Sequence, residues 1–243
     1  MAFLLCQPLF AVHAATLYAD VPLGFYFLAA FLLIAIHDRA GESKQAWLAL
    51  AGTAAGMAAW TKIEGMIFVL ALAAARTLMS LSAKRFRILL GEAAFFGLGL
   101  LPWMLLILYF RLNLPDRGPS LEGALVSGHL TFFQKILEPT RHWLVLKYYA
   151  REIFLSPSFS YVGPILLLSL YAAFSWRGRI LSWSQRSLGL SLALLLMGYY
   201  GAYLLSPHDL DWHLRFSIDR LLLQTWPSFV FLILNSSATK SSK

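Results

Sequence analysis

Charged side chains are scarce in this sequence. Aspartate, glutamate, lysine and arginine make up 13% of the 243 residues, compared with about 25% in a typical soluble domain. Hydrophobic residues make up 59% of the chain, and the mean hydropathy is +0.65. These proportions cannot cover a globular domain with water-exposed polar surface. The composition therefore excludes a soluble domain and predicts a polytopic membrane protein.

Cysteine and acidic residues are also rare. The single cysteine, Cys6, excludes an intramolecular disulfide framework and a cysteine-based metal site. Acidic residues number 12 against 20 basic ones, which gives a net charge of +8. The basic residues fall between apolar runs, where cytoplasmic loops collect lysine and arginine, so no nucleic-acid partner is predicted. No basic segment precedes Phe3, so a cleaved signal peptide is not predicted.

Long apolar runs recur along the chain. A helix needs about 20 apolar residues to cross a bilayer, and about 17 are tolerated. The sequence predicts an all-α transmembrane bundle of about seven to eight spans, folded as a single domain over residues 1–243. The predicted windows are 21–37, 46–61, 64–81, 88–110, 161–176, 187–206 and 221–236, and residues 3–17 form a shorter eighth stretch.

One connection is much longer than the others. Residues 111–160 form a polar and aromatic segment that is not expected to span the membrane. Within it, Leu121–Leu137 and Arg141–Phe154 have helical periodicity, and the second has an apolar and a charged face. This pattern is typical of amphipathic helices that lie on the bilayer surface.

The distribution of basic residues predicts which loops face the cytoplasm. One set of short loops holds most of them, and the other set holds only Lys62, Arg215 and Arg220. By the positive-inside rule the richer set is cytoplasmic, which places Asp20, the 61–65 turn, the 111–160 segment and the 205–220 segment outside. The richer set contains Arg39, Lys44, Arg76, Lys84, Arg85, Arg87, Arg177, Arg179, Arg186, Lys240 and Lys243.

Polar residues that are typical of a phosphate or acid–base site fall on this outward side. A carboxylate at the mouth of a membrane span costs free energy and is usually functional, which draws attention to Asp20. Arginine binds phosphate oxygens with two parallel hydrogen bonds, and a carboxylate can accept a proton or hold a divalent cation. The candidate substrate-binding residues are Asp20, Lys62, Glu64, His208, Asp211, His213, Arg215 and Arg220.

Structural explanations compete with these functional ones. Asp211, Arg215 and Asp219 lie four residues apart, which also fits a solvated salt-bridge ladder on a helix from about Asp209. Lys62 and Glu64 can simply stabilise a turn. The five-residue spacing of His208 and His213 does not match a helical zinc pair. Gly52 and Gly56 have the spacing of a helix-packing motif, within one chain or between chains.

Three segments together resemble the bacterial GT-C glycosyltransferases, polytopic enzymes that use polyprenyl-phosphate sugars and include aminoarabinose transferases and protein O-mannosyltransferases. Tyr18–Leu23 is similar to their outward acid followed by proline and an apolar helix. Ala51–Gly65 is similar to their small-residue helix that ends in a Thr-Lys turn. Asp211–Pro227 is similar to their late arginine-bearing segment that re-enters the membrane.

The resemblance implies transfer of a sugar from a lipid-phosphate donor to an acceptor outside the bacterial inner membrane. It places Asp20 at the family's second outward acid, on the donor side or beside a divalent cation such as Mg²⁺ or Mn²⁺. It places the catalytic acid in a first outward loop, after a first span, and this sequence is expected to begin after that loop. Sugar and acceptor are left open by the resemblance.

Two other functions stay open. A transporter or flippase for a lipid-linked or anionic solute predicts charges within spans and repeat symmetry. Glu92 is the charge that we place within a span window, and no repeat is visible. A non-catalytic assembly partner in the membrane is the third hypothesis.

Overall fold

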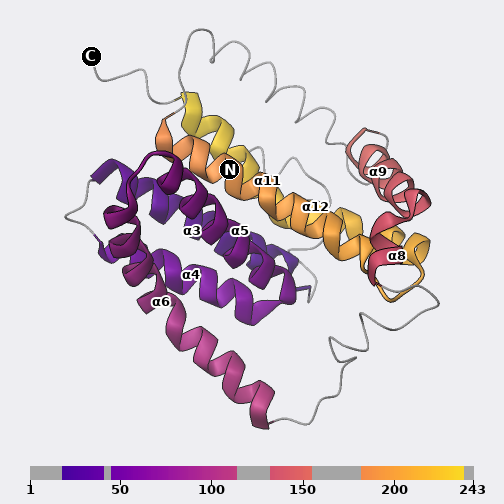
Figure 1. Cartoon of the computed structure of the whole chain (residues 1–243), viewed down its shortest axis with the longest axis horizontal. Helices are drawn as coiled ribbons and strands as arrows, with labels where there is room; N and C mark the ends of the chain where they lie inside the picture. Colours follow the sequence, from indigo (N-terminus) through magenta and orange to yellow (C-terminus); the bar gives the residue numbers. More distant parts are fainter. Residues whose placement is uncertain (1–17, 41–44, 114–131, 155–181, 238–243) are drawn as a thin grey trace.

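The computed structural model of this chain describes residues 18–40, 45–113, 132–154 and 182–237. These residues form eight α-helices and no strand, which confirms the all-α prediction for this part of the chain (Figure 1). In chain order the helices are α3 (Asp20–Ala40), α4 (Ala46–Thr61), α5 (Ile63–Ser82), α6 (Phe86–Asn113), α8 (Phe132–Leu137), α9 (Pro139–Phe154), α11 (Trp183–Leu204) and α12 (Leu210–Ser237).

Most predicted windows correspond to helices. Five windows match one helix each: 21–37 matches α3, 46–61 matches α4, 64–81 matches α5, 88–110 matches α6 and 187–206 matches α11. Window 161–176 and the stretch 3–17 lie outside the described residues. Window 221–236 lies inside α12, which already begins at Leu210, so most of the 205–220 segment is helix and not loop.

Four helices, α3, α5, α6 and α11, are long and apolar enough to cross a membrane. They support an integral membrane protein. The predicted seven to eight spans are not reached among the described residues. At 16 residues α4 is short for a span, and the first half of α12 carries charged side chains.

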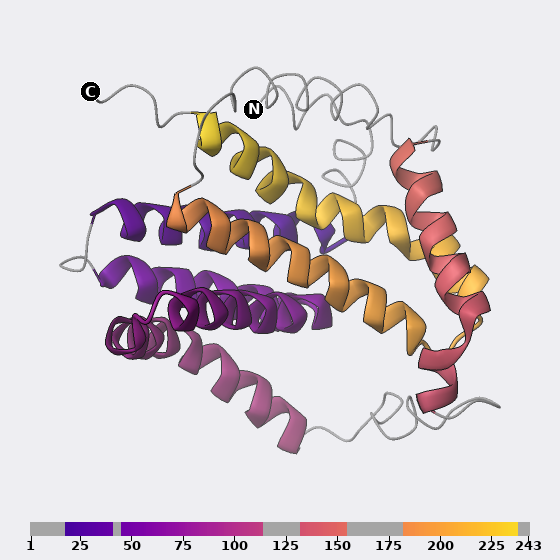
Figure 2. The same cartoon turned by 45° about the horizontal axis from the view of Figure 1, so that its top comes forward.

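The helices pack as an antiparallel bundle in which α4, α5 and α12 contact α3, and α11 lies against α5 and α12 (Figures 1 and 2). Aromatic side chains fill its centre. Phe27 of α3 stacks on Phe68 of α5 with ring centroids 4.2 Å apart, and Phe31 is 5.6 Å from the same ring. Because successive helices alternate in direction, the N-terminal ends of α3, α5 and α12 meet at one end of the bundle.

Small residues let α6 approach α4 closely. A Cβ on Gly52 would lie 2.0 Å from the carbonyl oxygen of Phe96, and one on Gly99 would lie 1.8 Å from that of Ala49. A Cβ on Gly56 would lie 2.5 Å from the Trp103 ring. The Gly52 and Gly56 pair therefore packs helices within one chain, which was one of its two predicted roles.

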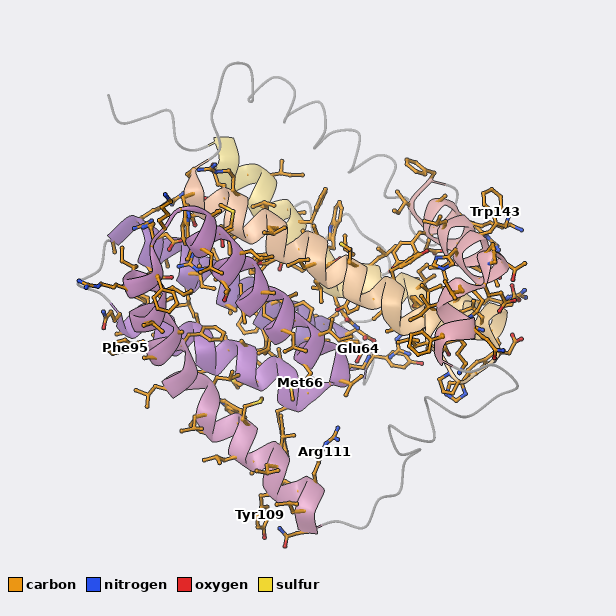
Figure 3. All side chains as sticks on the ribbon, in the orientation of Figure 1. Glu64, Met66, Phe95, Tyr109, Arg111 and Trp143 are labelled. Atoms are coloured by element: carbon orange, nitrogen blue, oxygen red, sulfur yellow. The ribbon has the colours of Figure 1, made fainter. Side chains whose placement is uncertain are left out.

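The helix α9 crosses the ends of α11 and α12 (Figure 2). Its Arg141 donates to the carbonyl oxygens of Leu204 and Ser206, at 3.0 and 3.3 Å, and so satisfies backbone acceptors at the C-terminal end of α11. Val145 and Tyr148 are buried, whereas Trp143 is exposed on the outer side (Figure 3).

The second helix predicted in the long segment is thus present as α9. Of the first, predicted over 121–137, only Phe132–Leu137 is described, as α8. A position of these helices on the bilayer surface stays a prediction.

Candidate functional site

Asp20 is the centre of a polar cluster at one end of the bundle. Its side chain is 0% exposed, although it begins α3. Oδ1 accepts hydrogen bonds from Lys62 Nζ at 2.8 Å and Gln224 Nε2 at 2.6 Å, and Oδ2 accepts one from Arg220 Nε at 2.8 Å. A buried carboxylate is tolerated only with such charged and hydrogen-bonding partners, so Asp20 is an anion held by two cations.

A tight turn places Lys62 beside Asp20. Lys62 alone is extended between two helices, with φ −155° and ψ 160°. A Cβ on Gly65 would lie 2.0 Å from the carbonyl oxygen of Ala58, so only glycine lets α5 start this close to the end of α4. The turn therefore directs Lys62 towards the start of α3 and leaves Glu64 next to it, with Glu64 Oε1 3.3 Å from Lys62 Nζ.

Two residues of α12, one turn apart, supply the other contacts to Asp20. Arg220 and Gln224 both face α3, where the close approach of Gly24 to the Gln224 backbone brings the helices together. Gln224 Oε1 also accepts a 3.1 Å hydrogen bond from the Tyr199 hydroxyl of α11. The guanidinium of Arg220 lies 4.5 Å from the Tyr18 ring centroid. Asp20 is thus connected to α4, α11 and α12.

A cavity of about 180 Å³ opens beside this cluster, between α5, α11 and α12. We call it the Asp20 cleft, although the buried carboxylate itself lies behind the two cations. Glu64, at the start of α5, is labelled where these helices meet in Figure 3. The polar residues that line the cleft are Lys62, Glu64, Tyr199, Tyr203, His213, Ser217, Arg220 and Gln224.

His213 brings an ionisable ring to the cleft. Its Nδ1 lies 2.8 Å from Ser206 Oγ, which in turn accepts a hydrogen bond from the backbone N–H of His208. Either atom can donate in this contact, because the Ser206 oxygen has two lone pairs and can accept from the His208 N–H and from a protonated Nδ1 together. Burial, together with nearby His208, lowers the pKa of His213 below its ordinary value of 6.5.

Three of the predicted site residues lie elsewhere. Asp211 accepts hydrogen bonds from Tyr148 at 2.7 Å and Arg215 at 2.8 Å, and neither Asp211 nor Arg215 lines the Asp20 cleft. Their side chains are 46% and 60% exposed, which fits an exposed salt bridge, one of the two predicted roles. Asp219, the third residue of the predicted ladder, accepts instead from the Arg220 backbone N–H at 2.8 Å. His208 contacts the Trp212 ring at 6.0 Å and is exposed. The cleft is therefore lined by four of the predicted residues, Lys62, Glu64, His213 and Arg220, and the predicted Asp20 lies behind them.

Sequence reasoning missed the uncharged polar residues of the cleft. Gln224 is fully buried and bridges Asp20 to Tyr199. The sequence does carry a sign of this role. Gln224 is the one amide side chain in the apolar stretch Leu221–Pro227, and it follows Arg220 by four residues, so both lie on the same face of a helix. Tyr199 and Tyr203 carry no comparable signal, because tyrosines in an apolar window are equally typical of interfacial anchors.

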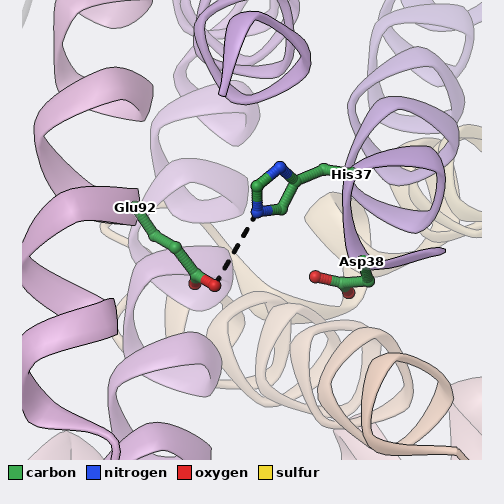
Figure 4. Close-up of side chains that lie close together, drawn as sticks. All are labelled: His37, Asp38 and Glu92. Atoms are coloured by element: carbon green, nitrogen blue, oxygen red, sulfur yellow. Dashed lines mark ion pairs between the residues drawn. The ribbon is translucent and has the colours of Figure 1, made fainter. Parts of the chain in front are cut away.

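A second ionic cluster lies at the opposite end of the bundle. Arg76 of α5 donates to both oxygens of Asp38 at 2.9 to 3.1 Å and to Glu92 of α6 at 2.6 Å. Its guanidinium also lies 4.4 Å from the Trp183 ring centroid. His37 Nε2 is 3.8 Å from Glu92 Oε1 (Figure 4). Arg76 was predicted in a cytoplasmic loop; it lies inside α5 and is 8% exposed.

The two clusters differ in how well they fit a divalent cation. Metal-ligating atoms of His37, Asp38 and Glu92 lie within 4.8 Å of one another, but Arg76 already contacts both carboxylates. At Asp20, Lys62 and Arg220 contact the two oxygens. A divalent cation would meet positive charge at either place. At Asp20 these two side chains would compete with Mg²⁺ or Mn²⁺ for the carboxylate oxygens, and metal binding there stays a prediction.

Comparisons of this chain with protein-family models, curated proteins and solved structures gave no match.

Proposed function

We propose that this protein is a membrane glycosyltransferase that transfers a sugar from a lipid-phosphate donor to an acceptor at the extracytoplasmic face. The observation that carries the proposal is the pairing of buried Asp20 with Lys62 and Arg220 at the wall of a cleft. A buried anion holds two cations in fixed positions there. The resemblance to GT-C enzymes gives the same residues a role beside the donor phosphate.

The two cations suit a phosphate ligand. Among the described residues, the hydrogen bonds from the Arg220 side chain to protein run through Nε, so its two terminal nitrogens are the groups offered to a ligand. Lys62 also lines the cleft and brings a second positive charge, with Glu64 Oε1 3.3 Å from its Nζ. When the sugar leaves a lipid phosphate, negative charge develops on the phosphate, and cations fixed in advance stabilise it without reorganising.

In this proposal Asp20 is a positioning residue. Both of its oxygens are engaged by donors, so it orients Lys62 and Arg220 and does not accept the proton of the attacking hydroxyl. Glu64 and His213 are the proton-accepting groups that line the cleft. The resemblance assigns the catalytic acid to another outward loop, and the proposal keeps that assignment.

The proposed orientation has the Asp20 cleft outside. Its support is the arrangement of basic side chains in the bundle. Arg39, Arg76 and Arg85 lie at the end opposite the cleft, where Arg39 hydrogen-bonds Asn235 near the end of α12 and Arg76 and Arg85 lie over Trp183. We propose seven to eight spans in all, in the bacterial inner membrane, with windows 3–17 and 161–176 among them.

Donor binding tests the proposal most directly. The purified full chain in lipid nanodiscs is titrated with polyprenyl-phosphate sugars, and binding is followed by isothermal calorimetry. Arg220→Gln is expected to weaken binding at least tenfold. Arg215→Gln removes the same charge from the exposed face of the same helix and is the matched control, expected to bind as the wild type does. Equal binding by both variants would remove Arg220 from the site.

A second assay follows the reaction itself. Transfer of radiolabelled sugar from the same donors to membrane acceptors is measured with wild type and Lys62→Gln. Loss of transfer in the variant supports the enzyme, whereas binding without transfer by the wild type would favour the non-catalytic partner.

The buried Arg76 cluster favours a transporter as the second candidate. Ionisable groups inside membrane helices commonly mark solute or proton pathways, and Arg76, Asp38 and Glu92 have side chains that are 9 to 15% exposed. Counterflow of a lipid-linked or anionic solute in liposomes, lost in Glu92→Gln and without sugar transfer, would replace the transferase proposal.

A further inference from the structure

The charged side chains around the Asp20 cleft are balanced. Lys62 and Arg220 line it, with side chains that are 24% and 27% exposed. Asp20 lies behind these two cations, and Glu64 Oε1 is 3.3 Å from Lys62 Nζ. Two cations therefore face two carboxylates, and these charges sum to zero. A bound anion adds negative charge to a partly buried place, where an uncompensated charge costs free energy.

His213 is the described side chain at the wall of the cleft whose charge changes near neutral pH, because histidine ordinarily titrates at about pH 6.5. Among the described residues, the side-chain hydrogen bond of His213 runs through Nδ1, so Nε2 is the ring nitrogen that is offered to a ligand. In the protonated ring both nitrogens carry a hydrogen. A protonated His213 therefore adds a positive charge and an N–H donor to the cleft.

The contact on the other side of the ring accommodates both charge states. His213 Nδ1 lies 2.8 Å from the hydroxyl oxygen of Ser206, which is 3% exposed. A hydroxyl can donate to the neutral ring or accept from the protonated one, and its second lone pair accepts from the His208 N–H in both cases. Protonation of His213 therefore breaks none of these hydrogen bonds.

The groups around the ring explain why it is neutral before a ligand binds. Burial, together with nearby His208, lowers the pKa of His213, and the charge of Glu64 opposes this effect. His208 is exposed, so solvent screens part of its charge. Asp219 accepts from the Arg220 backbone N–H and does not line the cleft. The nearby tyrosines titrate near pH 10 and stay neutral; they are Tyr149, Tyr199 and Tyr203.

The sugar donor of the proposed function keeps a constant charge in this pH range. A sugar joined to a lipid phosphate is a phosphodiester with one negative charge. It lacks the second ionisation that a phosphate monoester has near pH 6. A proton that is taken up when such a molecule binds therefore goes to the protein.

We propose that binding of the sugar donor is coupled to uptake of a proton by His213, which becomes the third cation of the site. This inference rests on the proposed function. A phosphate beside the ring favours its charged form and so raises the pKa of His213 in the complex. Between the pKa values of the free and the occupied protein, the affinity increases by up to about tenfold for each pH unit of acidification.

A proton count on the wild type tests the coupling directly. The purified full chain in lipid nanodiscs is titrated at pH 6.5 with a polyprenyl-phosphate hexose that has no other ionisable group. Isothermal calorimetry is repeated in two buffers with different enthalpies of ionisation, because the buffer supplies the proton. We expect uptake of about half a proton or more per bound molecule.

The outcomes separate this inference from the proposed function. Binding without proton uptake would overturn the inference alone. Absence of binding from pH 5.5 to pH 8 would overturn the proposed function together with the inference. Proton uptake that vanishes when the hexose phospholipid is replaced by a neutral hexose lipid would support the phosphate as the cause.

Variants assign the proton. His213→Gln is expected to abolish uptake and to change affinity less than about twofold between pH 8 and pH 5.5, where the wild type gains at least about tenfold. His208→Gln is the matched control, because it removes an exposed ring whose centroid is 5.8 Å from that of His213. The control should keep the uptake. Uptake that persists in His213→Gln, or that is lost in His208→Gln alone, would place the proton on another group and overturn the inference.

Discussion

The two ionic clusters at opposite ends of the bundle have inverse compositions. At Asp20 one carboxylate holds two cations, Lys62 and Arg220. At Arg76 one guanidinium holds two carboxylates, Asp38 and Glu92. The first cluster lines a cleft, where Glu64 also contacts Lys62, whereas in the second the guanidinium is enclosed by its partners and by Trp183.

This difference separates a binding arrangement from a structural one. Both clusters join helices that are distant in sequence, and both need their central residue because removing one partner leaves a buried charge unpaired. Arg76 also lines a cavity, but the walls of that cavity are mostly hydrocarbon, whereas the cavity beside Asp20 is lined by Tyr199, Tyr203, Ser217 and other hydrogen-bonding side chains. Substitutions in the two clusters should therefore change stability alike and donor binding differently.

The largest loss of stability is expected from Arg76→Met. It leaves Asp38 and Glu92 buried without a cation, with side chains that are 9% and 15% exposed. The free energy of unfolding should fall by about 3–5 kcal/mol. Thermal and denaturant unfolding in bicelles measure this loss, and residual folded protein should keep its donor affinity. Weaker donor binding by folded Arg76→Met would show that the two clusters are coupled.

Asp20→Asn should change both properties. The amide keeps the shape but removes the charge that compensates Lys62 and Arg220, so unfolding should become easier by about 3 kcal/mol. Donor affinity should fall about tenfold, since the cations are no longer held in place. Calorimetry on the folded fraction checks this result. Donor affinity equal to that of wild type would show that Asp20 does not position the cations.

Gly65→Ala tests the turn that directs Lys62 to Asp20. The new Cβ would meet the Ala58 carbonyl at 2.0 Å, so α5 must shift, at a cost of about 2 kcal/mol. Gly91→Ala on α6 is the matched control and should raise stability by up to about 1 kcal/mol, because alanine favours the helix. Similar unfolding curves for the two variants would contradict the close approach.

The protonation of His213 predicts a smaller, pH-dependent effect. Its pKa is lowered in the folded protein by burial and by His208, so the unfolded chain binds the proton more readily. The neutral ring contributes fully to the free energy of unfolding above pH 6.5, the ordinary pKa of histidine. This contribution is lost as the pH falls from there through the lowered pKa of folded His213. Melting temperatures at pH 5 to 8 should decline towards acid in wild type and less steeply in His213→Gln. Parallel curves would exclude this ring as the cause.

The smallest effect is expected from Arg215→Gln. A hydrogen bond from Tyr148 and the charge of Arg215 lower the pKa of Asp211, but the Asp211–Arg215 pair is on the exposed face of α12. Solvent screens such a pair, so stability and donor affinity should stay close to wild type. A clear loss of donor binding in calorimetry would show that the Asp211–Arg215 pair belongs to the donor site.

Hydrophobic windows predicted the helices well because each apolar run must satisfy its own backbone inside a membrane. The start of α12 at Leu210 was visible only as a conditional helix from Asp209, whose carboxylate accepts from the Trp212 N–H at 2.8 Å. The charged residues between Asp209 and Arg220 interrupt the apolar pattern, so the sequence did not show that this helix continues into window 221–236. Local sequence pattern therefore gave helix positions and missed one junction.

Tertiary contacts explain what the sequence could not show about the site. Asp20 and Lys62 were expected on one face, but their hydrogen bond depends on the extended backbone of Lys62. Gln224 was missed because its partner Asp20 lies 204 residues away. Arg76 was assigned to a loop because composition alone does not show that Asp38 and Glu92 compensate its charge.

The sequence separation of the Asp20 contacts has a consequence for the order of assembly during synthesis. Lys62 follows Asp20 by 42 residues, and Arg220 follows it by 200. At translation rates of about 5–20 residues per second, Lys62 is made roughly 2–8 s after Asp20 and Arg220 roughly 10–40 s after it. The ribosome-bound chain can therefore neutralise the carboxylate early with Lys62, through the α4–α5 hairpin. The second cation arrives only when α12, the last helix described, enters the bundle.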